Sequence, residues 1–204
     1  MDTSNLRKPS ETGLRRPTIL VVGASGILRP AASSLLAAGT DVIAVGRESD
    51  RLGDLDASTR GLRTSAALHV VAADASRPTF PAVVRRLLDS RRLRLDGAIV
   101  YAPASAPDVI EACVTAMGCA FVEVLTSQAA EPRSTDHQWS VADLPPIEGC
   151  QRSRRRRLVL GWQRRDRVPR WHNSEEISAA AVAALVLPGD RVLGSVTPWH
   201  DRPE

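Results

Sequence analysis

Short apolar runs alternate with stretches of helical periodicity along most of the chain. The apolar runs lie at residues 18–23, 41–46, 67–74, 96–102, 119–127, 157–162 and 191–197. Helical spacing of apolar residues, or an alanine-rich sequence, marks residues 27–38, 78–90, 108–117 and 173–187 and a shorter stretch through Leu52 and Leu55. This alternation is typical of parallel strands that helices cover on both faces. It predicts an α/β fold with a doubly wound, mostly parallel sheet of about seven strands.

The ends of this pattern and one interruption set the domain organisation. Residues 1–16 are polar and lack apolar periodicity, so we expect a flexible tail followed by a single domain over 17–204. Residues 128–153 contain prolines and mixed charge with little periodicity, which predicts a long loop or lid.

Composition narrows the class of protein. A chain of 204 residues can bury a full core without disulfides. Its longest apolar stretch is too short to cross a membrane and its start lacks the apolar segment of a signal peptide, so we expect a cytoplasmic protein. The three cysteines form no C-x-x-C pair and the four histidines have no metal-binding spacing, so we expect no metal.

An arginine-rich segment and all four tryptophans lie in the second half of the chain. The net charge is +4, and residues 152–170 hold many arginines but a single acidic residue. Such a segment binds polyanions in some proteins and forms a solvated strand pair in others. We favour the strand pair and do not expect nucleic-acid binding. The tryptophans are expected to fill the core or to line an aromatic pocket; they are Trp139, Trp162, Trp171 and Trp199.

A glycine loop after the first apolar run is the main functional signal. The sequence GASG, residues 23–26, joins a strand to the start of a helix, where backbone N–H groups and the helix dipole attract a pyrophosphate. Gly23 permits the tight turn, and Gly26 lets phosphates approach the backbone. Arg29 replaces the third glycine of such loops, a position that affects helix packing more than phosphate binding.

The second apolar run ends in Gly46 and Arg47, where a dinucleotide-binding protein selective for NAD has an acidic residue. A carboxylate accepts a hydrogen bond from the ribose 2′-hydroxyl of NAD, whereas a guanidinium pairs with the 2′-phosphate of NADP. We therefore expect NADP(H), with Arg47 as the main determinant and Ser25 as a helper. The alternative is that Arg47 is an ordinary exposed arginine before a helix.

From about Thr18 to Ser127 the chain resembles the short-chain dehydrogenase/reductase family. The resemblance rests on GASGIL, on VGRESDRLGDL, on Asp74 after the third run and on DGAIVYAPAS after the fourth. It implies a Rossmann-like fold, a homodimer or homotetramer, and contact of Asp74 with the adenine amino group. The candidate cofactor-binding residues, several of them implied by the resemblance, are Gly23, Ser25, Gly26, Ile27, Leu28, Arg29, Arg47, Asp74, Ala75, Ala102, Pro103, Ala104 and Thr126.

The chain departs from that family in its catalytic residues. The family uses a serine and a Tyr-x-x-x-Lys pair for proton exchange with the substrate oxygen. Here Tyr101 is the only tyrosine, in the fourth run, and Lys8 is the only lysine, in the tail. Ser127 or Thr126 matches the family's serine. The candidate proton donors are Ser127, Thr126, Asp136, His137 and Tyr101.

Three functions agree with these residues. The first is an NADPH-dependent reductase of an imine, activated alkene or carbonyl, with a non-standard proton donor, since hydride transfer is the cofactor's own chemistry. The second is a catalytically inactive NADP(H)-binding sensor or scaffold. The third is an isomerase or dehydratase built on the same fold.

Overall fold

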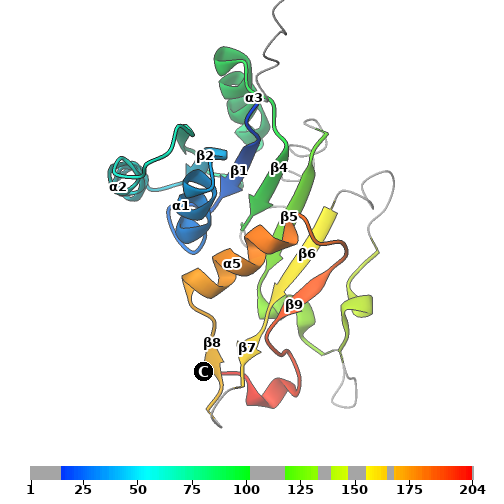
Figure 1. Ribbon diagram of the computed structural model, residues 1–204. Coiled ribbons are helices and arrows are strands. Elements are labelled where there is room, and N and C mark those ends of the chain that lie inside the picture. The colour runs from blue at the N-terminus through cyan, green and yellow to red at the C-terminus, as the bar shows by residue number, and fades with distance from the viewer. Residues whose placement is uncertain (1–14, 102–117, 133–138, 147–154, 165–167, 204) are drawn as a thin grey trace, which may run out of the picture.

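The computed structural model describes residues 15–101, 118–132, 139–146, 155–164 and 168–203. A seven-stranded sheet runs through these residues in the order β3-β2-β1-β4-β5-β6-β9, and every neighbouring pair is parallel (Figure 1). The strands are β1 (Thr18–Val22), β2 (Asp41–Gly46), β3 (Leu68–Ala72), β4 (Gly97–Val100), β5 (Ala120–Leu125), β6 (Arg155–Leu160) and β9 (Arg191–Leu193). The predicted doubly wound α/β sheet of about seven strands is confirmed.

Four α-helices flank the sheet in the described residues. They are α1 (Arg29–Ala37), α2 (Ser49–Thr59), α3 (Phe80–Arg91) and α5 (Ser174–Ala184), each at a stretch of predicted helical character. The helix expected at 108–117 lies outside the described residues, as does the predicted tail up to residue 14. No helix in the described residues is long and apolar enough to span a membrane.

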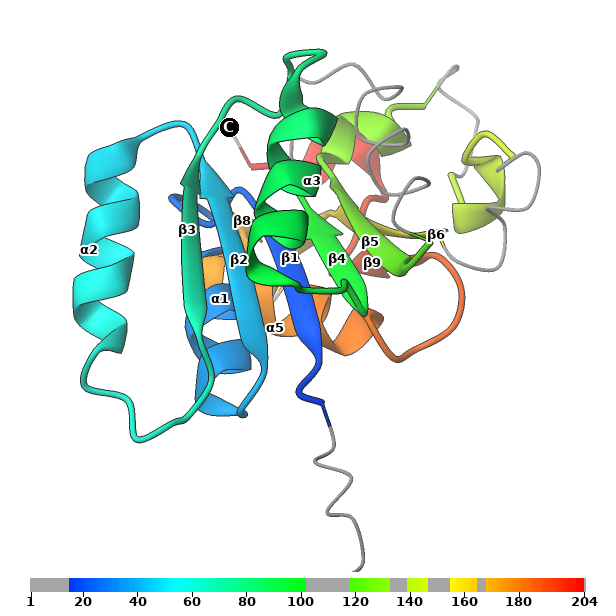
Figure 2. The same cartoon turned by 90° about the horizontal axis from the view of Figure 1, so that it is seen from above.

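Alternating side chains of the strands build a separate core on each face of the sheet. In β1, Ile19 and Val21 pack in the cluster that includes α1, α2 and α5, while Leu20 and Val22 pack in the cluster that includes α3. Figure 2 shows α1 and α5 on one side of the sheet and α3 on the other. A strand covered on both faces has no polar side, which explains why the strand sequences read as continuous apolar runs.

The described parts of the predicted loop at 128–153 pack against the second half of the sheet. They contain two short 3₁₀-helices, η1 (Ser127–Ala130) and η2 (Val141–Asp143). Trp139 and Trp162 lie in a third cluster of buried apolar side chains, where they are 9% and 0% exposed. The rings of Trp171 and Trp199 meet Trp162 edge-on, at centroid distances of 6.2 and 5.9 Å.

The strands β6 and β9 end earlier than their apolar runs predict, because the residues that follow the two strands pack against each other. After β6, Gly161 has no room for a side chain, since a Cβ would lie 2.6 Å from the carbonyl carbon of Ser195. Trp162 then exchanges two backbone hydrogen bonds of 2.8 Å with Ser195. The chain continues into a two-stranded antiparallel ribbon, β7 (Trp162–Gln163) with β8 (Arg170–Trp171), at the end of the arginine-rich segment where we expected a strand pair.

The arginines at the start of β6 do not form the solvated strand pair that we expected. Strand β6 lies between β5 and β9, and its arginines have partners on neighbouring segments. Arg155 donates to Glu123 on β5, with 3.0 Å from Nε to Oε2. Arg157 is 8% exposed and donates to Asp190, with 2.8 Å from Nε to Oδ2. The prediction is wrong here because carboxylates far along the sequence neutralise these charges inside the fold.

Candidate functional site

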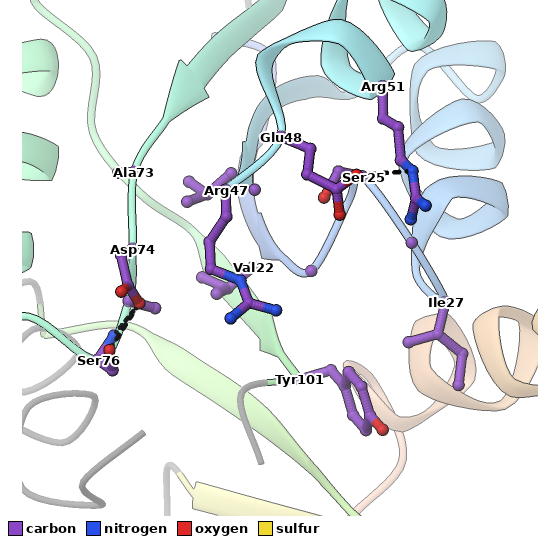
Figure 3. A pocket seen from close by; sticks show the side chains of 15 residues that line it. Val22, Ser25, Ile27, Arg47, Glu48, Arg51, Ala73, Asp74, Ser76 and Tyr101 are labelled. Atoms are coloured by element: carbon purple, nitrogen blue, oxygen red, sulfur yellow. Dashed lines mark hydrogen bonds and ion pairs between the residues drawn. The ribbon is translucent and has the colours of Figure 1, made fainter. Parts of the chain in front are cut away.

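A cavity of about 250 Å³ opens at the carboxyl ends of the first three strands (Figure 3). Its walls come from the loop after β1, the segment that leads from β2 into α2, the residues after β3, and Tyr101 after β4. The chain runs from β1 outward to β2 and β3, then returns to place β4 on the other side of β1. Ligands of doubly wound sheets bind at such a reversal of strand order.

The loop after β1 is pinned against β2. The N–H groups of Gly23 and Ala24 both donate to the carbonyl of Val45, at 2.9 and 3.0 Å. Gly23 has a φ of +98°, and a Cβ on it would lie 3.0 Å from the carbonyl oxygen of Tyr101. Only glycine adopts this conformation in this space without strain. The backbone between β1 and α1 is therefore held in one position.

Beyond this turn the loop has room and unused donors. A Cβ on Gly26 would find only the carbonyl oxygen of Gly23 within 4 Å, at 3.9 Å. The N–H groups of Ser25 and Ile27 donate to no acceptor in the part of the chain that the structure describes. Free N–H groups just before a helix, together with its dipole, bind anions such as phosphate. The loop fits a pyrophosphate.

Close packing joins this loop to the end of β2. A Cβ on Gly46 would lie 2.6 Å from Cβ of Ser25, so the serine side chain sits directly over the glycine. This contact leaves Ser25 on the cavity wall beside Arg47. The role of Gly46 was not recognised in the sequence, because it depends on a contact with a residue in another loop.

Positive charge in the cavity comes from the start of α2. Arg47 is exposed, and its side chain points into the cavity on the side of Tyr101 (Figure 3). Within the described residues its guanidinium has no hydrogen bond and no ion pair. Arg51 also lines the cavity but pairs with Glu48, at 2.9 Å from Nε to Oε2. Sequence reasoning missed Glu48 and Arg51, although their spacing of three residues at a helix start is a signal for such a pair.

Asp74 places an ionised carboxylate on the opposite wall. The N–H and hydroxyl of Ser76 donate to its Oδ1 at 2.9 and 2.7 Å. These hydrogen bonds, and then the charges of Arg77 and Arg47, hold the pKa of Asp74 below its ordinary value. The carboxylate is thus charged and fixed in orientation, and it can accept a hydrogen bond from a ligand.

The structure gathers about half of the candidate cofactor-binding residues around this cavity. Those that line it are Gly23, Ser25, Gly26, Ile27, Arg47, Asp74 and Ala75. Leu28 is fully buried in the core, and Arg29 turns away to donate to Ser58 Oγ at 3.3 Å. Ala102, Pro103 and Ala104 lie outside the described residues.

The candidate proton donors follow the ends of two neighbouring strands. Tyr101 follows β4, and Thr126 and Ser127 follow β5. These strands are parallel and Val100 pairs with Glu123, so their carboxyl ends meet at the same edge of the sheet. Asp136 and His137 lie outside the described residues.

Comparison with known proteins shows a likeness in fold. No protein-family model and no curated protein matches the sequence. Among solved structures, YwfH, an NADPH-dependent reductase involved in bacilysin biosynthesis, is 17% identical, with a TM-score of 0.63 over 89% of this chain and 100% of that chain. A 3-oxoacyl-[acyl-carrier protein] reductase from Brucella melitensis is 18% identical, with a TM-score of 0.60 over 87% and 95%.

A short-chain type dehydrogenase/reductase from Mycobacterium ulcerans is also similar. It is 17% identical, with a TM-score of 0.61 over 86% of this chain and 87% of that chain. These likenesses establish the Rossmann-like α/β fold of the chain.

Proposed function

We propose that this protein is an NADPH-dependent reductase of the short-chain dehydrogenase/reductase type. Its substrate is a small molecule with an imine, activated alkene or carbonyl group. The observation that carries the proposal is the Arg47 guanidinium, which has no partner among the described residues and points into a cavity beside a loop whose N–H groups are likewise free there. A free arginine beside an anion-binding loop suits a dinucleotide that has a pyrophosphate and a 2′-phosphate.

Three parts of NADP(H) have a complementary group in the cavity. The N–H groups of Ser25 and Ile27 suit the pyrophosphate, and Arg47 suits the 2′-phosphate. The carboxylate of Asp74 is held ionised, which suits the adenine amino group as a donor. The nicotinamide, when bound, supplies or accepts the hydride.

Reduction of a carbonyl or an activated alkene consumes one proton besides the hydride, and a side chain or a water molecule at the site supplies it. Thr126 and Ser127 follow β5 at the sheet edge that also carries the cavity, and their hydroxyls are our candidates for hydrogen bonding to the substrate. His137 remains a predicted donor. An imine needs less help than a ketone, because a protonated imine is already electrophilic. We therefore place imines first among the acceptors.

A specific observation supports a second candidate, a module that binds NADP(H) without chemistry. Lys8 is the only lysine, 93 residues before the only tyrosine, Tyr101. The two residues thus cannot form a Tyr-x-x-x-Lys pair on one helix. A protein that only senses or carries the cofactor would need the cavity but no proton donor.

Ligand titration tests the proposal. We would titrate NADPH, NADP⁺, NADH and NAD⁺ by calorimetry against the wild type, Arg47→Ala and, as a control, Arg60→Ala, which changes an exposed arginine just after α2 and outside the cavity. We expect NADPH to bind at least tenfold more tightly than NADH, and Arg47→Ala alone to remove the difference. At a hundredfold excess over Kd, a bound ligand raises the free energy of unfolding by about 2.7 kcal/mol, which thermal unfolding detects.

Each part of the proposal has an outcome that contradicts it. If no dinucleotide binds, the cofactor site itself is wrong. Equal affinity for NADPH and NADH would contradict the role of Arg47. If NADPH binds but none of the imine, alkene and ketone acceptors oxidises it, as followed by its absorbance, the protein is a binding module.

A further inference from the structure

The cavity presents two guanidinium groups, and in the part of the chain that the structure describes a carboxylate holds one of them. Arg51 and Glu48 form an ion pair of 2.9 Å in the first turn of α2, and both line the cavity (Figure 3). Their side chains are 60% and 52% exposed. Arg47 points into the same cavity without a partner among the described residues. The guanidinium of Arg47 is thus available to a ligand, whereas that of Arg51 is restrained by its ion pair with Glu48.

An ion pair of this exposure is easily exchanged. Solvent screens its attraction, and two long side chains must be ordered to form it, so such pairs contribute little to stability. A phosphate group carries a larger negative charge than a carboxylate and accepts two hydrogen bonds from one guanidinium. A ligand phosphate in the cavity can therefore draw Arg51 away from Glu48.

The carboxylate of Glu48 stays at the cavity wall when Arg51 changes partner. It then lies close to the phosphate, and like charges at short range repel each other. Glu48 thus opposes phosphate binding in two ways, by competing for Arg51 and by direct repulsion. Neither effect acts on a ribose whose 2′-hydroxyl is free of phosphate.

We propose that Glu48 is a specificity-determining residue, which weakens the preference of the cavity for a 2′-phosphorylated adenosine. This inference rests on the proposed NADP(H) site. In the wild type Arg47 provides most of the attraction for the 2′-phosphate, and Arg51 adds a part that Glu48 limits. Removal of the carboxylate makes both arginines available.

Two nucleotide fragments test this proposal without any enzyme activity. Adenosine 2′,5′-bisphosphate carries the 2′-phosphate, and adenosine 5′-monophosphate lacks it. We would measure their affinities by calorimetry for the wild type, Glu48→Gln, Arg51→Gln and the double variant. The matched control is Asp56→Asn, which breaks the Asp56–Arg60 ion pair of 2.6 Å at the end of the same helix, outside this cavity.

We expect Glu48→Gln to raise the affinity for the bisphosphate three- to tenfold and to change that for the monophosphate less than twofold. Asp56→Asn should change neither affinity. Arg51→Gln should lower the affinity for the bisphosphate more in the Glu48→Gln background than in the wild type, because the arginine is then free. Higher salt should reduce the gain from Glu48→Gln.

Two results would overturn the proposal while the cofactor site stands. In the first, the wild type prefers the bisphosphate but Glu48→Gln has no more effect than Asp56→Asn. In the second, Glu48→Gln weakens only the monophosphate, which would make Glu48 an acceptor for the 2′-hydroxyl. If the wild type binds neither fragment, the proposed NADP(H) site fails and this inference fails with it.

Discussion

Arginine serves opposite purposes in the two halves of the molecule. In the first half, Arg47 is exposed beside a cavity and has no partner among the described residues. In the second half, Arg157 is 8% exposed, donates through Nε to Asp190, and donates through Nη1 to the carbonyl of Pro145. The residue type is the same, yet one guanidinium is available to a ligand and the other is part of the fold.

This difference separates a binding site from a structural feature. A buried charge must be paired, because an unpaired one loses its hydration without compensation. An exposed, unpaired charge next to a cavity has no such requirement, and its attraction is left for a ligand. The number of arginines in a segment therefore says less about function than the partners of each one. Four variants test the difference between residues that hold the fold and residues that bind a ligand, in order from the largest expected effect to the smallest.

Removal of the acid that pairs with the buried arginine should have the largest effect. We expect Asp190→Ala to lower the free energy of unfolding by about 3–5 kcal/mol, because Arg157 is left buried without its carboxylate. Urea unfolding followed by fluorescence measures this. Asp56→Asn, which breaks an exposed pair, should cost less than about 1 kcal/mol. Similar losses for the two variants would contradict a structural role for the Arg157 pair.

Gly23 should prove to be required by the fold as well as by the site. The backbone here has a φ of +98°, which a residue with a side chain adopts only under strain. An added Cβ would also lie 3.0 Å from the carbonyl oxygen of Tyr101. We expect Gly23→Ala to reduce the free energy of unfolding by about 1–3 kcal/mol, since backbone strain of this kind has that magnitude. Thermal unfolding without any nucleotide measures it, and an unchanged Tm would disprove the strain.

Gly26 should separate binding from stability. A Cβ here enters open space and does not strain the backbone, so Gly26→Ala should leave Tm unchanged within the error of the measurement. In calorimetry its affinity for NADPH should fall at least tenfold, because the methyl group keeps the pyrophosphate from the loop. The control is Gly53→Ala within α2, where an added Cβ would meet nothing within 4 Å. If Gly26→Ala binds NADPH like this control, the phosphate is not bound at this loop.

The smallest effect concerns the start of α5. Hydrogen bonds from Arg170, then from the Asn173 N–H, lower the pKa of Glu176 from 4.5 to about 2. A lowered pKa means that the carboxylate stabilises the fold above about pH 4.5 and that this contribution disappears as the pH falls toward 2. Glu176→Gln should therefore have a slightly lower Tm than the wild type at pH 7, and the two Tm values should converge near pH 2. A difference that is constant with pH would mean that ionisation of Glu176 is not involved.

Local sequence determined the strands, most of the helices and the shape of the glycine loop. Each apolar run became a strand, because a short run without a polar side suits a strand that is covered on both faces. Asn173 and Glu176 have the three-residue spacing of a capping box, and each side chain accepts a hydrogen bond from the other's backbone N–H, at 2.8 and 3.0 Å. The spacing of Gly23 and Gly26 likewise placed one glycine at the strained turn and one at the open cavity wall.

Only the tertiary structure decided which polar groups are free. Arg29 donates to Ser58, and Arg155 and Arg157 pair with acids 32 and 33 residues away, while Arg47 has no partner in the described part of the chain. The sequence could not reveal this, because charge pairing depends on which distant segments the sheet brings together. Periodicity is a property of neighbours along the chain, whereas a binding site depends on contacts between segments that only folding makes neighbours.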